Sequence, residues 1–223
     1  MSDQKASTGG SAPGVALDDK GRSQAAELVN RLGSCVEQIT AVARSPLQRC
    51  GETVAPLLAA ITEQTGRQVP EVVVDDLAEV DYGSWTNRPI KDLLAEPLWK
   101  VVQQHPSAAV FPEGEGLSQV QARAVAAIRR LDREFGGPDG SGAWIACSHG
   151  DVIKAVLADA LGIHLDGFKR ITAAFGIDPT FFADQDSTRL LAEVQDVTQD
   201  PEISPTPADV TELAALVKNH PDL

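Results

Sequence analysis

The chain has 223 residues, 43% hydrophobic and 23% charged, a balance typical of one globular domain with a sizeable core. Its formal net charge of −13 argues against binding to nucleic acid or anionic membranes, while leaving room for a small local anion site. Three cysteines, an odd number without a Cys-x-x-Cys pair, argue against a disulfide framework and a zinc site. The N-terminus has no apolar signal core and no run reaches ~18 apolar residues, so we expect a cytoplasmic protein.

The first part of the chain predicts a polar lead followed by a helix and a strand. Residues 1–14 are mostly Ser, Gly and Ala with few apolar side chains, which is typical of a disordered segment. Asp18 is a suitable N-cap for an amphipathic helix that continues to Leu32. The short apolar run at 39–43 then predicts a strand.

A second helix and a second strand are expected next. Ser45 suits the N-cap of this helix and Pro46 its first turn, where the missing N–H costs nothing. Pro56 should kink or break the helix. Residues 71–74 predict a strand, and 77–92 a loop with short helical turns.

The middle of the chain predicts two more helices. Residues 93–104 have a helical pattern and are followed by a loop containing Pro and Gly. The clearest amphipathic helix runs over 117–135, with Leu, Val, Ala, Ile and Phe lining one stripe. A Gly-rich turn cluster at 136–140 ends it.

A histidine then stands where a buried strand passes into a helix. Residues 143–147 form an apolar run without alternation, as in a parallel strand covered on both faces. Helical spacing follows from Val152 to Gly162, so His149 lies at the carboxyl end of the strand, where α/β proteins bind ligands and helix N–H groups favour anions. The alternative is a lone histidine that caps the helix.

The C-terminal region is harder to interpret. Residues 190–197 fit a strand or a short helix, and three prolines mark 200–207 as a linker. Thr206 caps a last helix whose apolar face must pack on the domain or on a second copy, which makes a homodimer possible. We therefore divide the chain into a lead (1–14), an α/β domain (15–190) and a divergent C-terminal segment (191–223).

Several motifs together resemble the histidine phosphatase superfamily, whose fold is phosphoglycerate-mutase-like. They are Ser-Pro-Leu-x-Arg at 45–49, Leu-x-Glu-x-x-x-Gly-x-Trp at 77–85 and Ser-His-Gly at 148–150, in the family's order and spacing. The chain is most similar to an actinobacterial phosphomutase branch, with which it shares the pattern at 14–22 and the loop at 104–112. The resemblance covers about Pro13 to Ala173 and implies a three-layer α/β/α sandwich.

The resemblance also implies a metal-independent phosphomonoester hydrolase or phosphomutase without a cofactor, acting on a small phosphorylated substrate. Arg49 corresponds to a phosphate-binding arginine, whose guanidinium can hold two phosphate oxygens at once. His149 corresponds to the family's second histidine, which donates to the phosphoryl oxygens, and nearby phosphate favours its charged form. Glu79 corresponds to the proton donor, since a carboxyl beside a dianion is held protonated.

Each of these residues also has a structural interpretation: an exposed helix arginine, a structural histidine and a surface carboxylate. His105, His164 and His220 have no partner motif, and we expect them to be structural or exposed. Arg44 stands where the family often has Ser or Thr, so it either adds charge near the pocket or faces solvent.

One departure from the family pattern is decisive for activity. The family's nucleophile is the histidine of an Arg-His-Gly motif that ends its first strand, and this sequence contains no Arg-His-Gly. Two alternatives follow. The protein is either an enzyme, provided that an upstream segment supplies the Arg-His-Gly motif, or a non-catalytic relative that binds phosphate or a partner protein. Without the first strand we expect the flanking strands to close up, residues 190–197 to fill the slot, or another copy to donate a strand, because unpaired buried backbone groups are costly.

Overall fold

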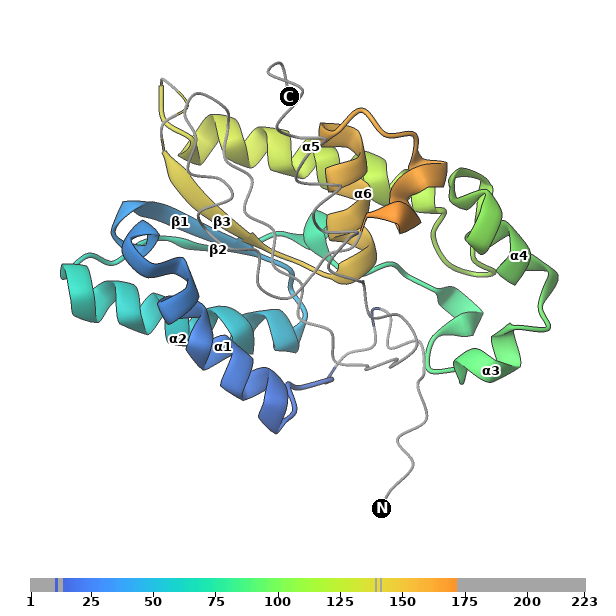
Figure 1. The fold of residues 1–223 in the computed structure, drawn as a ribbon, viewed down its shortest axis with the longest axis horizontal. Helices are drawn as coiled ribbons and strands as arrows, with labels where there is room; N and C mark the ends of the chain where they lie inside the picture. Colours follow the sequence, from blue (N-terminus) through green and yellow to red (C-terminus); the bar gives the residue numbers. More distant parts are fainter. Residues whose placement is uncertain (1–10, 12–13, 139, 141, 172–223) are drawn as a thin grey trace.

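The computed structural model describes residues 11, 14–138, 140 and 142–171, which form a parallel sheet and the helices around it (Figure 1). The helices and strands are α1 (Asp19–Leu32), β1 (Ile39–Arg44), α2 (Gln48–Thr65), β2 (Glu71–Val73), α3 (Ile90–Leu93), α4 (Pro97–Gln104), α5 (Leu117–Phe135), β3 (Ala143–Cys147) and α6 (Gly150–Ala160). Short 3₁₀ turns join them: η1 (Gly33–Gln38), η2 (Asp75–Leu77), η3 (Gly83–Trp85), η4 (Pro106–Ala108) and η5 (Leu165–Arg170).

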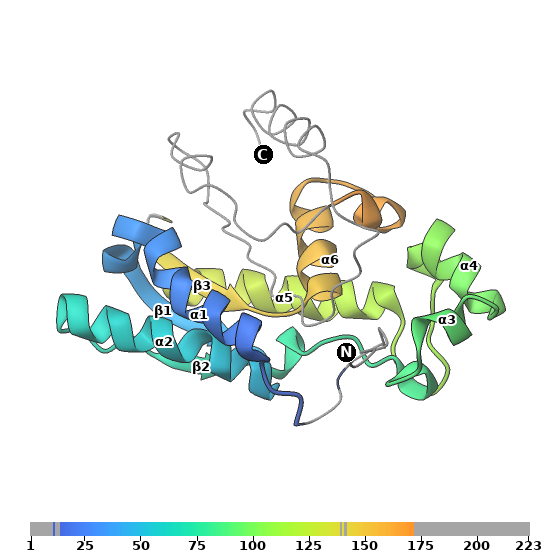
Figure 2. The same cartoon turned by 60° about the horizontal axis from the view of Figure 1, so that its bottom comes forward.

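The centre is a parallel sheet with the strand order β2-β1-β3. Helices α1 and α2 cover one face and pack on it through Leu28, Val54 and Leu57, while α5 covers the other through Ala127 and Leu131. Figures 1 and 2 show these helices on opposite sides of the strands. The predicted three-layer α/β/α architecture is therefore confirmed.

β1 and β3 are hydrogen-bonded directly to each other, so the slot that the family's first strand occupies is closed. This is the first of the three expected outcomes. The segment 190–197, which was to fill the slot in the second outcome, lies outside the described residues.

The new pairing carries an irregularity at Thr40. Ile39 pairs with Ala143 and Ala41 with Trp144, so Thr40 is an extra residue in the manner of a β-bulge. Its hydroxyl donates to the carbonyl oxygen of Ala143 at 2.9 Å. Residues three apart in a regular strand point to opposite faces of the sheet. The bulge shifts this alternation by one residue, so that Ile39 and Val42 belong to the same core cluster.

The strand β3 differs from its prediction. All five of its residues are half-buried, whereas the sequence indicated a strand covered on both faces. Within the described part of the chain β3 has one hydrogen-bonded neighbour, β1, and lies at the end of the strand order. A strand in that position is covered less than a central one.

Three helix predictions need correction. Pro56 does not break α2, which is continuous because Val54, Leu57 and Ile61 are almost fully buried in the core. Ser45 does not cap α2, whose N-cap is Leu47, because the serine hydroxyl is taken up by a contact described below. The helix predicted at 93–104 begins only at Pro97, as α4, and Leu93 is instead the last residue of the short helix α3.

The N-cap of α1 is confirmed, since Asp18 Oδ1 accepts a hydrogen bond from Gly21 N at 2.7 Å. The helix α5 has the predicted bounds. The C-terminal helix expected from Thr206 onward lies outside the described residues, and the three domain boundaries stay predictions. No helix in the described ranges is long and apolar enough to cross a membrane.

Candidate phosphate site

His149 lies at the carboxyl edge of the sheet, between the end of β3 and the start of α6. It is buried, with 5% of its surface exposed, and its carbonyl accepts the N–H of Ile153 in the first turn of α6. Its Nε2 lies 2.7 Å from Ser45 Oγ, and its Nδ1 lies 3.2 Å from Arg49 Nε. The sheet thus brings together Ser45 and Arg49 from one motif and His149 from another.

These contacts define the protonation of His149. An arginine Nε can only donate, so Nδ1 of His149 is the acceptor and Nε2 carries the proton. Nε2 then donates to the hydroxyl of Ser45, a residue that is fully buried. In this arrangement the imidazole is neutral and the guanidinium supplies the positive charge of the site.

The segment between β1 and α2 explains why Arg49 points into the site. Ser45 N donates to Cys147 O at 2.9 Å, which extends the β1–β3 pairing by one residue. Ser45 Oγ accepts from Leu47 N at 3.2 Å, so the serine hydroxyl shapes the turn that precedes the helix. Arg49 follows in the first turn of α2, where its side chain reaches His149, two residues after the end of β3.

Glu79 is half-buried in the loop that follows η2. Burial is the main cause that raises the pKa of this carboxyl to about 6, and the charge of Asp151 raises it further. The charge of Arg49, and that of His149 when its imidazole is protonated, act in the opposite direction. Glu79 is therefore close enough to both residues for their charges to act on it, and the structure gathers all three predicted site residues.

Tyr82 and Asp151 lie beside the candidate site but were not predicted as part of it. Tyr82 donates its hydroxyl to Asp151 Oδ2 at 2.9 Å, beside Glu79. Burial is the largest cause that holds the pKa of Tyr82 well above its usual range, and Asp151 and Glu79 add to it. Tyr82 lies within the motif that carries Glu79, and Asp151 directly follows the motif that carries His149. Their closeness to these motifs in the sequence is the signal from which they could have been predicted.

Cys50 was also missed, although it is the direct neighbour of Arg49. Its sulfur lies 3.6 Å from His149 Nε2 and 3.8 Å from the carbonyl oxygen of Ser148. It is 3% exposed. A buried thiol therefore lies directly beside the candidate histidine.

The remaining candidates lie away from this constellation. The side chains of His105 and His164 are 70% and 75% exposed, as expected, and His220 lies outside the described residues. Arg44 neither joins the pocket nor faces open solvent. It pairs with Glu71 across β1 and β2 and donates to Ser45 O at 3.1 Å.

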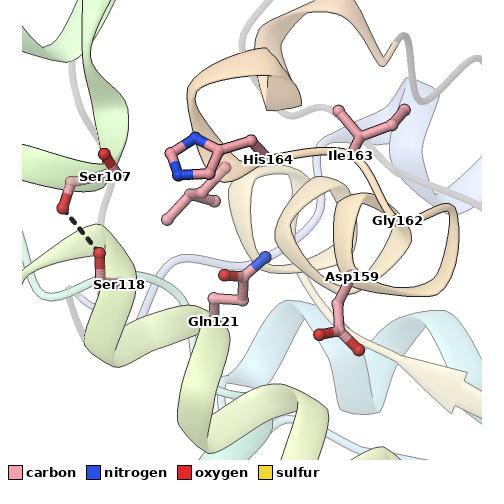
Figure 3. A pocket seen from close by; sticks show the side chains of 8 residues that line it. Ser107, Ser118, Gln121, Asp159, Gly162, Ile163 and His164 are labelled. Atoms are coloured by element: carbon pink, nitrogen blue, oxygen red, sulfur yellow. Dashed lines mark hydrogen bonds between the residues drawn. The ribbon is translucent and has the colours of Figure 1, made fainter.

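A separate cavity of about 370 Å³ lies between the start of α5 and the end of α6 (Figure 3). Its lining includes Ser107, Ser118, Gln121 and His164, so it is distinct from the site around His149. Among the described residues, no group of three or more His, Cys, Asp or Glu side chains is placed to hold a metal ion.

The model of the Histidine phosphatase superfamily (branch 1) matches residues 3–176 of this chain. This chain belongs to the histidine phosphatase superfamily. The family model spans all three motifs on which the resemblance was based, and the predicted family is confirmed.

Several solved structures have the same fold as this chain. The mycobacterial glucosyl-3-phosphoglycerate phosphatase Rv2419c, in a structure with VO3, is 21% identical with a TM-score of 0.63, covering 80% of this chain and 85% of that one. A putative α-ribazole-5′-P phosphatase from Escherichia coli is 24% identical with a TM-score of 0.60, covering 73% and 75%. The protein of open reading frame Rv3214 from Mycobacterium tuberculosis is 28% identical with a TM-score of 0.55, covering 78% and 77%. The mycobacterial matches agree with the predicted actinobacterial branch.

A shorter match is of a different kind. The HTH-type transcriptional regulator RamB from Mycobacterium tuberculosis is 50% identical over 54 residues, which are 24% of this chain. The chain spans 11% of the length of that curated relative. The predicted absence of nucleic-acid binding stays a prediction.

Proposed function

We propose that this chain is a phosphate-binding member of the superfamily that does not turn its ligand over. Arg49 and His149 would bind the phosphoryl group of a small phosphomonoester, or inorganic phosphate, at the carboxyl edge of the sheet. The observation that carries this proposal is the hydrogen bond from Arg49 Nε to His149 Nδ1. It joins the two residues that correspond to the family's phosphate ligands.

Phosphate binding would replace the hydrogen bond between Arg49 and His149 with hydrogen bonds from Arg49 to the phosphate. A phosphate dianion offers Arg49 two oxygens in a planar geometry that matches its guanidinium, and one of them replaces Nδ1 of His149. Once released, Nδ1 accepts a proton, since a nearby dianion favours the imidazolium. The charged imidazole then donates to a phosphoryl oxygen, and the site takes up a proton as it binds.

Transfer of the phosphoryl group to the protein lacks its nucleophile in this sequence. The family transfers the phosphoryl group to the histidine of Arg-His-Gly, and this sequence has no such motif. The direct pairing of β1 with β3 leaves no slot between these two strands for the strand that carries that histidine in the family. His149 is a poor substitute, because donor and nucleophile act from opposite sides of the phosphate.

The second candidate function is a metal-independent phosphomonoester hydrolase or phosphomutase. It is favoured by Glu79, whose pKa is raised to about 6, mainly by burial. A carboxyl with this pKa is suited to deliver a proton to a leaving alcohol near neutral pH. In this second function Glu79 would act as the proton donor of the family reaction.

The relatives suggest which probes to use. One structure of the glucosyl-3-phosphoglycerate phosphatase Rv2419c holds inorganic phosphate and another holds VO3. We infer that phosphate and vanadate suit the site of this chain as well. Location in the cytoplasm and assembly as a homodimer remain predictions.

The experiment that separates the two functions is hydrolysis of p-nitrophenyl phosphate. We expect the chain to be no faster than its His149→Ala variant. Grafting a family first strand that ends in Leu-Arg-His-Gly ahead of Pro13 should create activity. Robust turnover that depends on His149 in the unmodified chain would favour the hydrolase and identify another residue as the nucleophile.

A further inference from the structure

Two cysteines from distant parts of the sequence meet beneath the candidate site. Cys147 ends β3, where it pairs with Arg44, and Cys50 lies in the first turn of α2. The Cys147 thiol lies 3.9 Å from the carbonyl oxygen of Cys50, and its side chain also hydrogen-bonds the Cys50 thiol. The turn at 45–47 holds the two residues together, since it leads from the end of β1 directly into α2.

The surroundings of Cys50 favour its thiolate, the reactive form of a cysteine. The hydrogen bond from Cys147 is the largest cause that lowers the pKa of Cys50 to about 5, against burial, which raises it. A hydrogen bond from His149 and the charge of Arg49 lower the pKa of Cys50 further. The sulfur also lies 3.6 Å from His149 Nε2. A positively charged neighbourhood at the first turn of a helix is typical of reactive cysteines.

We propose that Cys50 and Cys147 form a redox-sensitive dithiol that closes to a disulfide when a hydroperoxide oxidises it. One thiolate attacks the peroxide oxygen, which gives a sulfenic acid and releases an alcohol, or water from hydrogen peroxide. The second thiol attacks the sulfenic sulfur, the S–S bond forms and water leaves. In total, two thiols lose two protons and two electrons, and the hydroperoxide accepts both.

Closing the disulfide draws the sulfur of Cys50 toward β3 and away from Nε2 of His149, because a disulfide needs a defined S–S distance and dihedral angle. Neither thiol needs a bound phosphate for this reaction. The proposal therefore stands or falls independently of the proposed phosphate-binding function.

The third cysteine is a built-in control. Cys35 is half-buried in η1, ahead of β1, whereas Cys50 follows that strand. The six residues of β1 span about 20 Å at the usual rise of about 3.3 Å per residue, so Cys35 is too far from Cys50 and Cys147 for a disulfide within the folded chain.

Trypsin separates the three cysteines into the peptides 32–44, 50–67 and 134–154, so the pairing can be read directly. The full chain is treated with hydrogen peroxide, alkylated with iodoacetamide and digested without reduction. We expect 50–67 and 134–154 to appear linked, at a mass two hydrogen atoms below their sum, and 32–44 to appear alkylated. Dithiothreitol should abolish the link, and Cys35→Ser should leave it unchanged.

The variant Cys147→Ser should stop the reaction at Cys50, which then accumulates as sulfenic and sulfinic acid because no second thiol resolves it. Recovery of 50–67 and 134–154 as separate alkylated peptides after peroxide treatment of the wild-type chain would overturn the proposal. A link from either of them to 32–44 as the main product would do the same.

Discussion

The guanidinium of Arg49 donates through Nε to Nδ1 of His149 at 3.2 Å, so the two residues expected to bind phosphate bind each other. The contact holds the imidazole neutral, with its proton on the side of Ser45. A phosphate therefore has to compete with an existing hydrogen bond, and binding is coupled to the uptake of a proton by His149.

Gly83 is required by a close approach of two backbones. Its φ is +51°, and a Cβ there would lie 2.1 Å from the carbonyl oxygen of Pro112. Gly66 has a φ of +69° with open space around it. We expect Gly66→Ala to cost about 1 kcal/mol of unfolding free energy for the left-handed backbone. Gly83→Ala should cost about 1–3 kcal/mol more, because the protein backbone must move.

Urea denaturation of both variants measures this difference. Equal unfolding free energies for Gly83→Ala and Gly66→Ala would show that the loop at 112–114 yields without cost. In that case Glu79 is not held in place by the packing of these two loops.

The continuous helix α2 depends on burial rather than on helix propensity. Leu57 follows Pro56 and is fully buried, whereas Leu94 is 58% exposed. Truncation of Leu57 to Ala should lower the unfolding free energy by about 2–5 kcal/mol, and Leu94→Ala should change it by less than about 0.5 kcal/mol. Denaturant midpoints at constant m-value give the comparison. A small effect of Leu57→Ala would mean that α2 is not anchored to the sheet at this point.

Glu79 makes the stability of the fold depend on pH. Its folded pKa of about 6 lies above its ordinary value of 4.5, so the folded state favours the neutral carboxyl. The stability that this group contributes is complete below about pH 4.5 and is lost as the pH rises through about 6, a total of about 2 kcal/mol. Glu79→Gln should remove this decrease. Parallel stability curves for wild type and Glu79→Gln between pH 4 and 7 would count against a raised pKa for Glu79 in the folded state.

Much of the fold was predictable because its signals are local. The amphipathic stripe at 117–135 and the N-cap at Asp18 fix α5 and α1 without knowledge of the rest of the chain. The effect of Pro56 was not predictable in the same way, since the buried contacts of Leu57 come from residues distant in sequence. The bulge at Thr40 also has no local signal, because it follows from the register in which β1 meets β3.

The site shows the same division. Arg49, Glu79 and His149 were predicted from their motifs, and the structure brings them into one neighbourhood. Cys50 and Asp151 were missed because their importance lies in what they contact, Nε2 of His149 and the hydroxyl of Tyr82. Such contacts join residues about a hundred and about seventy positions apart, respectively.

The central claim is that Arg49 and His149 form a phosphate site. Isothermal titration calorimetry with inorganic phosphate, in two buffers of different ionisation enthalpy, measures both the affinity and the proton uptake. We predict weak binding with net uptake of protons by the wild-type chain. Arg130→Ala removes the same charge at a position 52% exposed and serves as the matched control. Arg49→Ala should lose a charge-assisted contact of about 1.5–3 kcal/mol, which raises Kd roughly ten- to hundredfold, while Arg130→Ala stays close to wild type. The same Kd for wild type and Arg49→Ala, or binding without proton uptake, would contradict the account.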